Sequence, residues 1–547
     1  MVRAAQQANS VFEQLKATAT QFGDRPFLCV LPETAAVYGI AAGEITYAAL
    51  LAVVERLIGD YSVAGLRAGD RVGLLLENRP SFYKHWFALN ALGVSVVPIN
   101  PDLRAAELEY LVAHSEIVAA VVIDTRVADI DAAAVAGGRN VVVFRPEDAI
   151  PNLRTAGVRP NSFEASRETE CALLYTSGTT GRPKGCVLTN TYFLNSGQWY
   201  LNVGGLIQLI PGEERMLTPL PLFHMNAMAT SSMTMLMSGG CIVVLDRFHP
   251  KSWWDSVRAA QATIVHYLGV MPPILMGATA GAADRDHRVR FGFGAGVDRR
   301  LHEVFEARFG FPLIEAWAMT ETGGGVVIAA NVEPRHVGTS CFGRPGPESD
   351  VRIVTDDGSD ARVDQPGELL VRRAGDDARL GFFREYLKDP AATAEAWASG
   401  WFHTGDVVRR DAEGYLYFVD RKKNVIRRSG ENIAAVEVES VLLQHPDVQA
   451  VGVAAVADEV RGEEVLACIV PRTGYEPDLY DLLARSIVAD CLHRLAYYKA
   501  PGYVAFVGSL PLTSTQKIQR GALKVLAAEQ LDKSTTYDLR LLKKRTV

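Results

Sequence analysis

The 547-residue sequence predicts a large α/β N-terminal domain, which ends in a small β-barrel-like antiparallel unit, and a small α+β C-terminal domain. Short apolar runs alternate with helix-like segments up to about residue 337, which is typical of parallel sheets flanked by helices. From about residue 338, short strand-like pieces are separated by turn signals instead. Helix and strand patterns are mixed after residue 424, and the total length fits about three to four domain-sized units.

The elements of the first part follow from the apolar runs in order. RVGLLL (71–76) predicts a strand, SFYKHWFALNALG (81–93) an amphipathic helix that ends at glycine, and VSVVPIN (94–100) the next strand. The alternation continues through a helix and further strands, namely AELEYLVAHS (106–115), AAVVID (119–124), CIVVLD (241–246), ATIVHYLG (262–269) and RFGFGAG (290–296). Because strands that alternate with helices usually pair in parallel, we expect mostly parallel sheets.

The later part predicts two further units. Strand-like pieces with hairpin turns at DDGSD and DAEG indicate an antiparallel β unit at about 338–420, which completes an N-terminal domain of 1–420. IAAVEVESVLLQHPDV predicts a helix, and VQAVGVAAVAD and EVLACIVPR predict strands, of a C-terminal domain at 425–530. Residues 531–547 end in DLRLLKKRTV and are expected to form a loose basic tail.

Composition limits the class of protein. The net charge of −7 argues against nucleic acid as a partner, since phosphate backbones attract basic surfaces. Seven scattered cysteines without CxxC spacing indicate reduced thiols, not a disulfide framework or a zinc site. The polar N-terminal segment lacks the apolar region of a signal peptide, and the apolar runs are too short to span a membrane. We therefore expect a cytoplasmic protein.

The stretch YTSGTTGRPKG, from Tyr175 to Gly185, carries the first functional signal. It follows the strand pattern CALLY and precedes the N-cap pair Thr189–Asn190, so we expect a loop that leaves a strand and returns before a helix. Glycines let backbone N–H groups turn inward, and Lys184 adds a positive charge. The expected phosphate-binding loop contains Thr176, Ser177, Gly178, Thr179, Thr180, Gly181 and Lys184. It is not a Walker A loop, and composition alone also fits a flexible surface loop.

TSGTTGRPKG resembles the signature loop of the adenylate-forming superfamily, which comprises acyl-CoA and aryl-CoA synthetases, peptide-synthetase adenylation domains and firefly luciferase. The other family motifs have counterparts in the same order between Phe12 and about Leu526. They are LPLFHMNAM, FGFGAGVDRRL, EAWAMTETGGG, GWFHTGD, VDRKKNVIRRSGENIAAVEVE and PLTSTQKIQR. Singly, Glu321 fits a solvated helix charge, His224 an interior histidine, Asp406 a turn residue and Lys517 a surface lysine. The ordered set favours the functional interpretation.

The resemblance implies ATP, Mg²⁺ and coenzyme A as cofactors and assigns residues to them. For the nucleotide it implies contacts from Gly294, Ala295, Gly296, Trp317, Asp406 and Arg421 in addition to the loop, with Glu321 as the metal ligand. The implied catalytic residues are Lys517, Thr320, Glu321 and His224, and the implied acyl pocket contains His224, Asn226, Ala318 and Met319. Residues 421–424, with Lys423, would be the hinge of a mobile C-terminal domain, and Gly430 would lie beside the pantetheine arm. Homodimers occur in the family.

Two positions depart from the family pattern. Gln516 replaces the usual glycine before Lys517, which changes how this lysine enters the site. Ala318 replaces a glycine that limits the acyl pocket, and one extra methyl group trims the pocket without closing it. Small residues and methionines in HMNAMATSSMTMLM suit an adaptable apolar pocket.

The chemistry implied by the family has two steps. A carboxylate attacks the α-phosphorus of ATP to form an acyl-adenylate and pyrophosphate, and a thiol then displaces AMP. SGENIAAVEVE looks most like crotonobetaine/carnitine–CoA ligases, so we expect a small to medium acid as donor and CoA as acceptor. One alternative is an enzyme that loads a carrier-protein thiol, and another is a nucleotide-binding regulator that has lost the chemistry. No residue pattern points to the third alternative, a luciferase-type oxidation.

Overall fold

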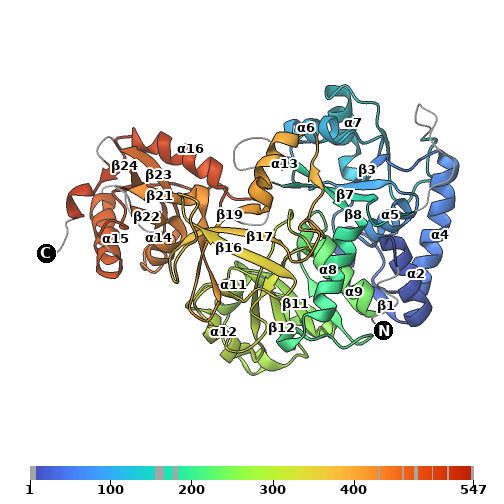
Figure 1. The fold of residues 1–547 in the computed structure, drawn as a ribbon, viewed down its shortest axis with the longest axis horizontal. Coiled ribbons are helices and arrows are strands. Elements are labelled where there is room, and N and C mark those ends of the chain that lie inside the picture. The colour runs from blue at the N-terminus through green and yellow to red at the C-terminus, as the bar shows by residue number, and fades with distance from the viewer. Residues whose placement is uncertain are drawn as a thin grey trace. The chain divides into compact units, whose positions relative to one another are not determined.

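The computed structural model describes residues 8–153, 165–176, 183–428, 431–458, 461–472, 479–495, 497–513 and 517–543. The chain divides into two compact units (Figure 1). The described residues of the first unit lie within 8–351 and 371–402, and those of the second within 352–370 and 403–543.

The first unit contains two largely parallel sheets, as predicted. The eight-stranded sheet has the order β14-β13-β12-β11-β9-β10-β1-β2 and is parallel except at β14 and β2. Its strands are β1 (Pro26–Val30), β2 (Gly43–Thr46), β9 (Arg215–Thr218), β10 (Cys241–Val244), β11 (Ile264–Leu268), β12 (Phe291–Ala295), β13 (Leu313–Trp317) and β14 (Ile328–Ala329). All four residues of β10 are buried, as expected for a parallel strand covered on both faces.

The second sheet of this unit has the order β18-β8-β7-β4-β3-β5-β6. Its strands are β3 (Arg71–Leu75), β4 (Ser95–Pro98), β5 (Ala119–Val122), β6 (Val142–Phe144), β7 (Glu170–Thr176), β8 (Lys184–Thr189) and β18 (Glu385–Tyr386). β8 pairs antiparallel with both β7 and β18, whereas the strands from β7 to β6 are parallel.

Helices cover these sheets in the places that the apolar periodicity predicts. α6 and α7 pack on the seven-stranded sheet, and α10, α11 and α12 pack on the eight-stranded sheet. The helices of the unit are α2 (Val11–Phe22), α3 (Pro32–Tyr38), α4 (Tyr47–Ala64), α5 (Pro80–Ala91), α6 (Ala105–Ser115), α7 (Val127–Ala136), α8 (Asn190–Asn202), α9 (Ser232–Ser238), α10 (Trp253–Ala259), α11 (Met271–Met276), α12 (His302–Phe309) and α13 (Pro390–Ala396).

The local topology around the glycine-rich loop differs from our expectation. The loop does not return directly to a helix, because β8 intervenes and pairs with β7 so that Lys184 lies opposite Thr176. α8 begins only after β8, and the side chain of its N-cap residue Thr189 forms no capping hydrogen bond. Asn190 instead accepts a 2.8 Å bond from Asn90 Nδ2, so it ties α8 to α5.

The second unit contains an antiparallel sheet and a mixed sheet. In the first, β20 (Leu416–Arg421), β19 (Phe402–Arg410), β17 (Gly367–Arg373) and β16 (Ser349–Val354) are neighbours in this order, and the unit boundaries fall within β16 and β17. The mixed sheet contains β21 (Val425–Arg428), β22 (Glu431–Ala434), β23 (Val448–Asp458), β24 (Gly462–Pro471), β25 (Tyr503–Phe506) and β26 (Thr536–Asp538). Its helices are α14 (Ala435–Leu442), α15 (Tyr480–Arg494) and α16 (Arg520–Leu531).

The expectation of a loose tail is wrong for residues 536–543. β26 pairs antiparallel with β25, and Leu539 is buried in the core of the second unit. Lys543 Nζ lies 2.5 Å from Glu464 Oε1, and both side chains are fully buried. The tail is ordered because a long-range ion pair and an edge strand hold it, neither of which a local basic pattern reveals.

Two further observations concern the whole described chain. All seven cysteines are buried free thiols. Among the described residues, no helix combines the length and the apolar character needed to cross a bilayer.

Candidate active site

The ends of the glycine-rich loop are held by side chains of α6. Tyr110 donates a 2.9 Å hydrogen bond to the Pro183 carbonyl oxygen, and the Tyr175 hydroxyl lies 2.8 Å from His114 Nδ1. Thr176 Oγ1 lies 3.5 Å from the Lys184 carbonyl oxygen across the two strands. The remaining predicted loop residues, Ser177, Gly178, Thr179, Thr180 and Gly181, lie outside the described part of the chain.

Glu321 and Lys184 both contact one tyrosine, Tyr386. The Tyr386 hydroxyl donates a 2.9 Å hydrogen bond to Glu321 Oε1, and Lys184 Nζ lies 4.7 Å from the centre of the Tyr386 ring. Burial and the neighbouring Glu321 carboxylate raise the pKa of Tyr386, which keeps the hydroxyl protonated as a donor. The structure therefore brings the predicted metal ligand and the predicted phosphate-binding lysine to one place, through a residue that the sequence did not single out.

The carboxylate of Glu321 fits the predicted metal. It is buried, and a carboxylate offers about four acceptor sites, so the bond from the Tyr386 hydroxyl is compatible with metal binding. Mg²⁺ commonly takes one or two protein carboxylates together with phosphate oxygens and water, not a complete cage of protein ligands. Among the described residues no cluster of three metal-ligating side chains is present.

The segment before Glu321 follows the end of β13. Trp317 is buried, with its ring 6.4 Å from that of Phe342, whereas Ala318, Met319 and Thr320 are half-buried. The backbone of this turn is fixed, because the Thr320 carbonyl oxygen accepts a 2.9 Å bond from the Tyr192 hydroxyl. Hence the predicted pocket residues Ala318 and Met319 retain accessible surface beside the predicted adenine contact.

The turn from Gly294 to Gly296 requires glycine. A Cβ on Gly294 would lie 2.3 Å from the Tyr267 carbonyl oxygen, and Gly296 has φ +82°. Glu315 anchors the turn, since its carboxylate accepts 2.9 Å bonds from the backbone N–H groups of Gly296 and Val297. Burial raises the pKa of Glu315. We did not predict this role, although an acidic residue inside the apolar strand LIEAW is a recognisable signal.

His224 and Asn226 lie where the chain enters a π-helical segment, Asn226–Ser231. Such segments occur frequently at functional sites. His224 is exposed, so the alternative of an interior structural histidine is wrong. Asn226 is half-buried, and its Oδ1 lies 3.0 Å from Nδ1 of the buried His266, another residue that the sequence did not single out.

The second unit brings three other predicted residues together. Asp406 on β19 faces Arg421 on β20, with Oδ1 2.9 Å from the guanidinium Nε. Desolvation and the nearby Arg421 lower the pKa of Lys517, although part of this lysine remains exposed. Thr513 fixes the Lys517 backbone through a 3.1 Å bond from the Lys517 N–H and a 2.7 Å bond to its carbonyl. A carboxylate and nearby cations are the kinds of groups that bind a ribose and a phosphate.

The remaining residues that the sequence singled out are Lys423, Gly430 and Gln516. Lys423 lies in a short 3₁₀ turn, Lys422–Asn424, that directly follows β20. Gly430 and Gln516 lie outside the described residues. The hinge and pantetheine roles therefore stay predictions.

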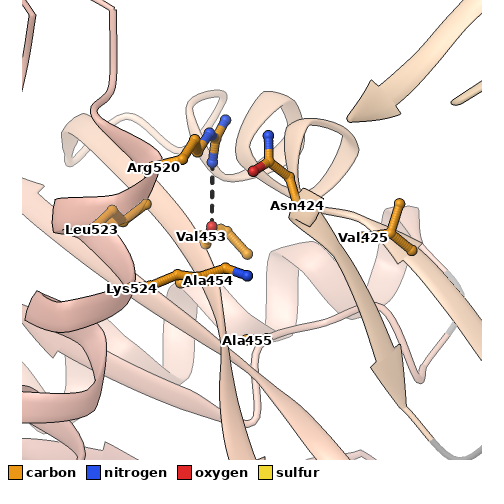
Figure 2. A pocket seen from close by; sticks show the side chains of 8 residues that line it. All are labelled: Asn424, Val425, Val453, Ala454, Ala455, Arg520, Leu523 and Lys524. Atoms are coloured by element: carbon orange, nitrogen blue, oxygen red, sulfur yellow. Dashed lines mark hydrogen bonds between the residues drawn. The ribbon is translucent and has the colours of Figure 1, made fainter. Parts of the chain in front are cut away.

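A small pocket of the second unit contains none of the predicted nucleotide, acyl or catalytic residues, and of the predicted hinge it contains Asn424. Figure 2 shows Arg520 reaching across it to the Val453 carbonyl oxygen, at 3.3 Å. The lining is otherwise mostly aliphatic, from Val425, Val453, Ala454, Ala455 and Leu523 with Asn424 and Lys524. Arg520 also forms a close ion pair with Glu439, at 2.5 Å, so its charge is already balanced within the unit.

Comparisons with known proteins identify the family of the chain. The pattern of the AMP-binding enzyme family matches residues 15–387, and that of the AMP-binding enzyme C-terminal domain matches residues 437–517. The chain is 29% identical to a crotonobetaine/carnitine–CoA ligase of Salmonella paratyphi C over 495 residues, which cover 88% of this chain and 93% of that protein.

The chain is also similar to solved structures of a CoA synthetase. The o-succinylbenzoate–CoA synthetase of Bacillus subtilis, in complex with an acyl-adenylate intermediate, is 25% identical with a TM-score of 0.77 and covers 93% of this chain and 97% of its own. The same enzyme with ATP and a magnesium ion has 25% identity and a TM-score of 0.76, and covers 93% and 98%. The resemblance seen in the sequence is thereby confirmed, and the chain belongs to the AMP-binding enzyme family.

Proposed function

We propose that the protein is an ATP-dependent carboxylic acid:CoA ligase that forms an acyl-adenylate and then an acyl-CoA thioester. The observation that carries this proposal is the placement of Lys184 and Glu321 on one tyrosine, Tyr386. A cation and a metal-binding carboxylate at this place can neutralise the triphosphate as the acid attacks. The relatives with CoA-ligase activity on different acids support the reaction class and leave the acid open.

In the first step, protein groups bind the nucleotide and place charge where it develops. Lys184 and the loop would hold the β- and γ-phosphates, and Asp406 with Arg421 would bind the ribose. Mg²⁺, when bound at Glu321, would supply positive charge to the phosphate oxygens. Lys517 would contact the carboxylate and α-phosphate oxygens, because a preplaced cation is most effective where negative charge accumulates.

In the second step, a thiol must approach the carbonyl carbon of the adenylate, beside which Lys517 would lie during the first step. We infer that the C-terminal domain turns at Lys423 and presents Gly430 beside the pantetheine arm. Because Lys517 would leave the site and Gly430 would enter it between the two steps, both would be carried by a separate domain that moves, as in other enzymes whose moving elements complete the site. No covalent intermediate with the protein is required.

The acceptor is tested by supplying the purified protein with ATP, Mg²⁺, a panel of acids, and either CoA or a phosphopantetheinylated carrier protein. The proposal expects CoA esters to form, and the carrier protein to remain unloaded at equal thiol concentration. Loading of the carrier without CoA ester would establish the alternative function. Adenylate formation without transfer to either thiol would contradict both.

We expect Tyr386→Phe to raise the Mg²⁺ concentration needed for half-maximal activity by about 10–100-fold, the usual cost of losing an outer-sphere partner of a metal ligand. The variant removes only the hydroxyl that donates to Glu321 and keeps the ring under Lys184. Initial rates against Mg²⁺ concentration measure the effect. Tyr110→Phe, which removes a hydroxyl from the loop end at Pro183, is the matched control and should leave the Mg²⁺ dependence unchanged.

We expect Ala318→Gly to relax the preference toward longer or branched acids. The change removes one methyl group, which is worth about 1 kcal/mol, or several-fold in relative efficiency. Relative kcat/KM over a series of acids from two to ten carbons measures it, with the ATP KM as the internal control. An unchanged chain-length profile would mean that Ala318 does not line the acyl pocket.

A further inference from the structure

A buried polar network stands behind Asn226. His266 on β11 is fully buried, with Nδ1 3.0 Å from Asn226 Oδ1 and 2.8 Å from Ser231 Oγ. Its other ring nitrogen, Nε2, lies 3.4 Å from the Tyr200 hydroxyl, and the Tyr200 and His266 rings are stacked. The π-helical turn places Asn226 and Ser231 on the same side, facing the imidazole.

The hydrogen bonds of this network fix the position of the imidazole proton. Ser231 Oγ donates to the Asn226 backbone carbonyl at 3.0 Å, so it accepts from His266. The proton of His266 is therefore on Nδ1, and it is shared between Ser231 Oγ and Asn226 Oδ1. The Tyr200 hydroxyl donates to Nε2. Burial lowers the pKa of His266 to about 3, so this neutral tautomer persists at neutral pH.

The network leaves the Asn226 side chain with a fixed direction. Because Oδ1 is held by His266, the amide Nδ2 points away from the imidazole. Asn226 is half-buried, whereas His266 and Ser231 are fully buried. Among the described residues, Nδ2 donates no hydrogen bond, so the amide is an oriented donor. The residues that follow Asn226 in sequence, Ala227, Met228 and Ala229, are apolar and buried.

We propose that Asn226 Nδ2 donates to an oxygen on the chain of the acid, and that His266 is the positioning residue that orients it. The substrate class is then a small to medium acid with a hydroxyl or oxo group on its chain, not a plain alkanoic acid. The inference rests on the proposed function and on the family resemblance, which implies that Asn226 belongs to the acyl pocket. A site that hydrogen-bonds a substrate oxygen discriminates against an analogue that lacks it, because the protein donor is left unpaired.

The experiment measures acid-dependent pyrophosphate release by the full chain with ATP, Mg²⁺ and CoA. The acids are hexanoate and its 3-hydroxy, 4-oxo and 5-oxo derivatives, which share one chain length. Wild type should use at least one oxygenated acid about 3–10-fold more efficiently than hexanoate, as expected for one neutral hydrogen bond. Asn226→Asp keeps the acceptor for His266 but replaces the Nδ2 donor, and should abolish this preference. Asn202→Leu, at the exposed end of α8, is the control and should preserve it.

Variants of His266 test its role separately. His266→Leu should lose the preference, whereas His266→Gln, which retains an N–H donor, should restore part of it. A purely structural role would lower the rates with all acids together and leave their ratio unchanged, which would overturn the positioning role.

The outcomes distinguish the inference from the function on which it rests. A wild-type preference for hexanoate over every oxygenated acid, or a preference that survives in Asn226→Asp, would overturn the inference alone. Pyrophosphate release with none of the acids in a wider panel would overturn the proposed function and this inference with it.

Discussion

Lys517→Ala will slow acyl-adenylate formation by about 10²–10³-fold, the usual cost of removing one group that stabilises developing charge. Lys517 lies near Arg421, which forms the ion pair with Asp406, and we propose that these three residues of the second unit bind the nucleotide. The variant keeps the Asp406–Arg421 pair and removes only the cation that we propose contacts the reacting oxygens. Acid-dependent exchange of pyrophosphate into ATP measures this step.

The second half-reaction provides the control for Lys517. Thioester formation from a supplied acyl-adenylate should largely survive in Lys517→Ala, because the thiol needs the space that this lysine leaves. If both half-reactions fall by the same factor, Lys517 does not act in one step only. The proposal of two domain positions would then be wrong for this chain.

Glu464→Gln will lower the free energy of unfolding of the second unit by about 3–5 kcal/mol, which is typical when one partner of a buried ion pair is removed. Glu464 accepts from Arg428 Nε at 2.7 Å and from Lys543 Nζ at 2.5 Å, and all three side chains are almost fully buried. The amide would leave two buried cations without a counter-charge. Urea unfolding of the full chain, followed by a probe in the second unit, measures the change.

Lys543→Met is the matched variant for this prediction. It leaves one cation, Arg428, with one carboxylate, Glu464, so charge balance is kept. Burial lowers the pKa of Lys543 to about 8, which shows that its site disfavours the charged form. We therefore expect a much smaller loss than for Glu464→Gln. A loss below about 1 kcal/mol in Glu464→Gln itself would place it among ordinary surface substitutions and contradict the assigned role.

The fold could be predicted from the sequence where local patterns determine it. Buried parallel strands such as β3, β5 and β10 consist of continuous apolar runs, and these runs were recognisable. The β7–β8 hairpin was not recognisable, because the sequence pattern of a strand does not indicate which other strand pairs with it. Residues 536–543 are ordered in part because Lys543 pairs with Glu464, which lies 79 residues away in sequence.

The candidate site likewise contains residues that the sequence could identify and residues that only the fold reveals. Glu321, Asp406 and Arg421 were singled out because they stand in recognisable motifs, and the structure pairs Asp406 with Arg421, both of which the resemblance assigns to the nucleotide. Tyr386 was missed because its role depends on a hydrogen bond to a residue 65 positions away. His266 was missed for a similar reason: it lies in an ordinary apolar strand, and only the fold places it against Asn226.

We propose above all that this chain activates a carboxylic acid as an adenylate. The most direct test is acid-dependent exchange of labelled pyrophosphate into ATP by the purified wild-type protein, across a broad panel of small and medium acids with Mg²⁺ and without CoA. We predict exchange above the acid-free control with at least one acid, and its loss in Lys517→Ala. Exchange that does not depend on any acid in the panel, or no exchange at all, would contradict the claim.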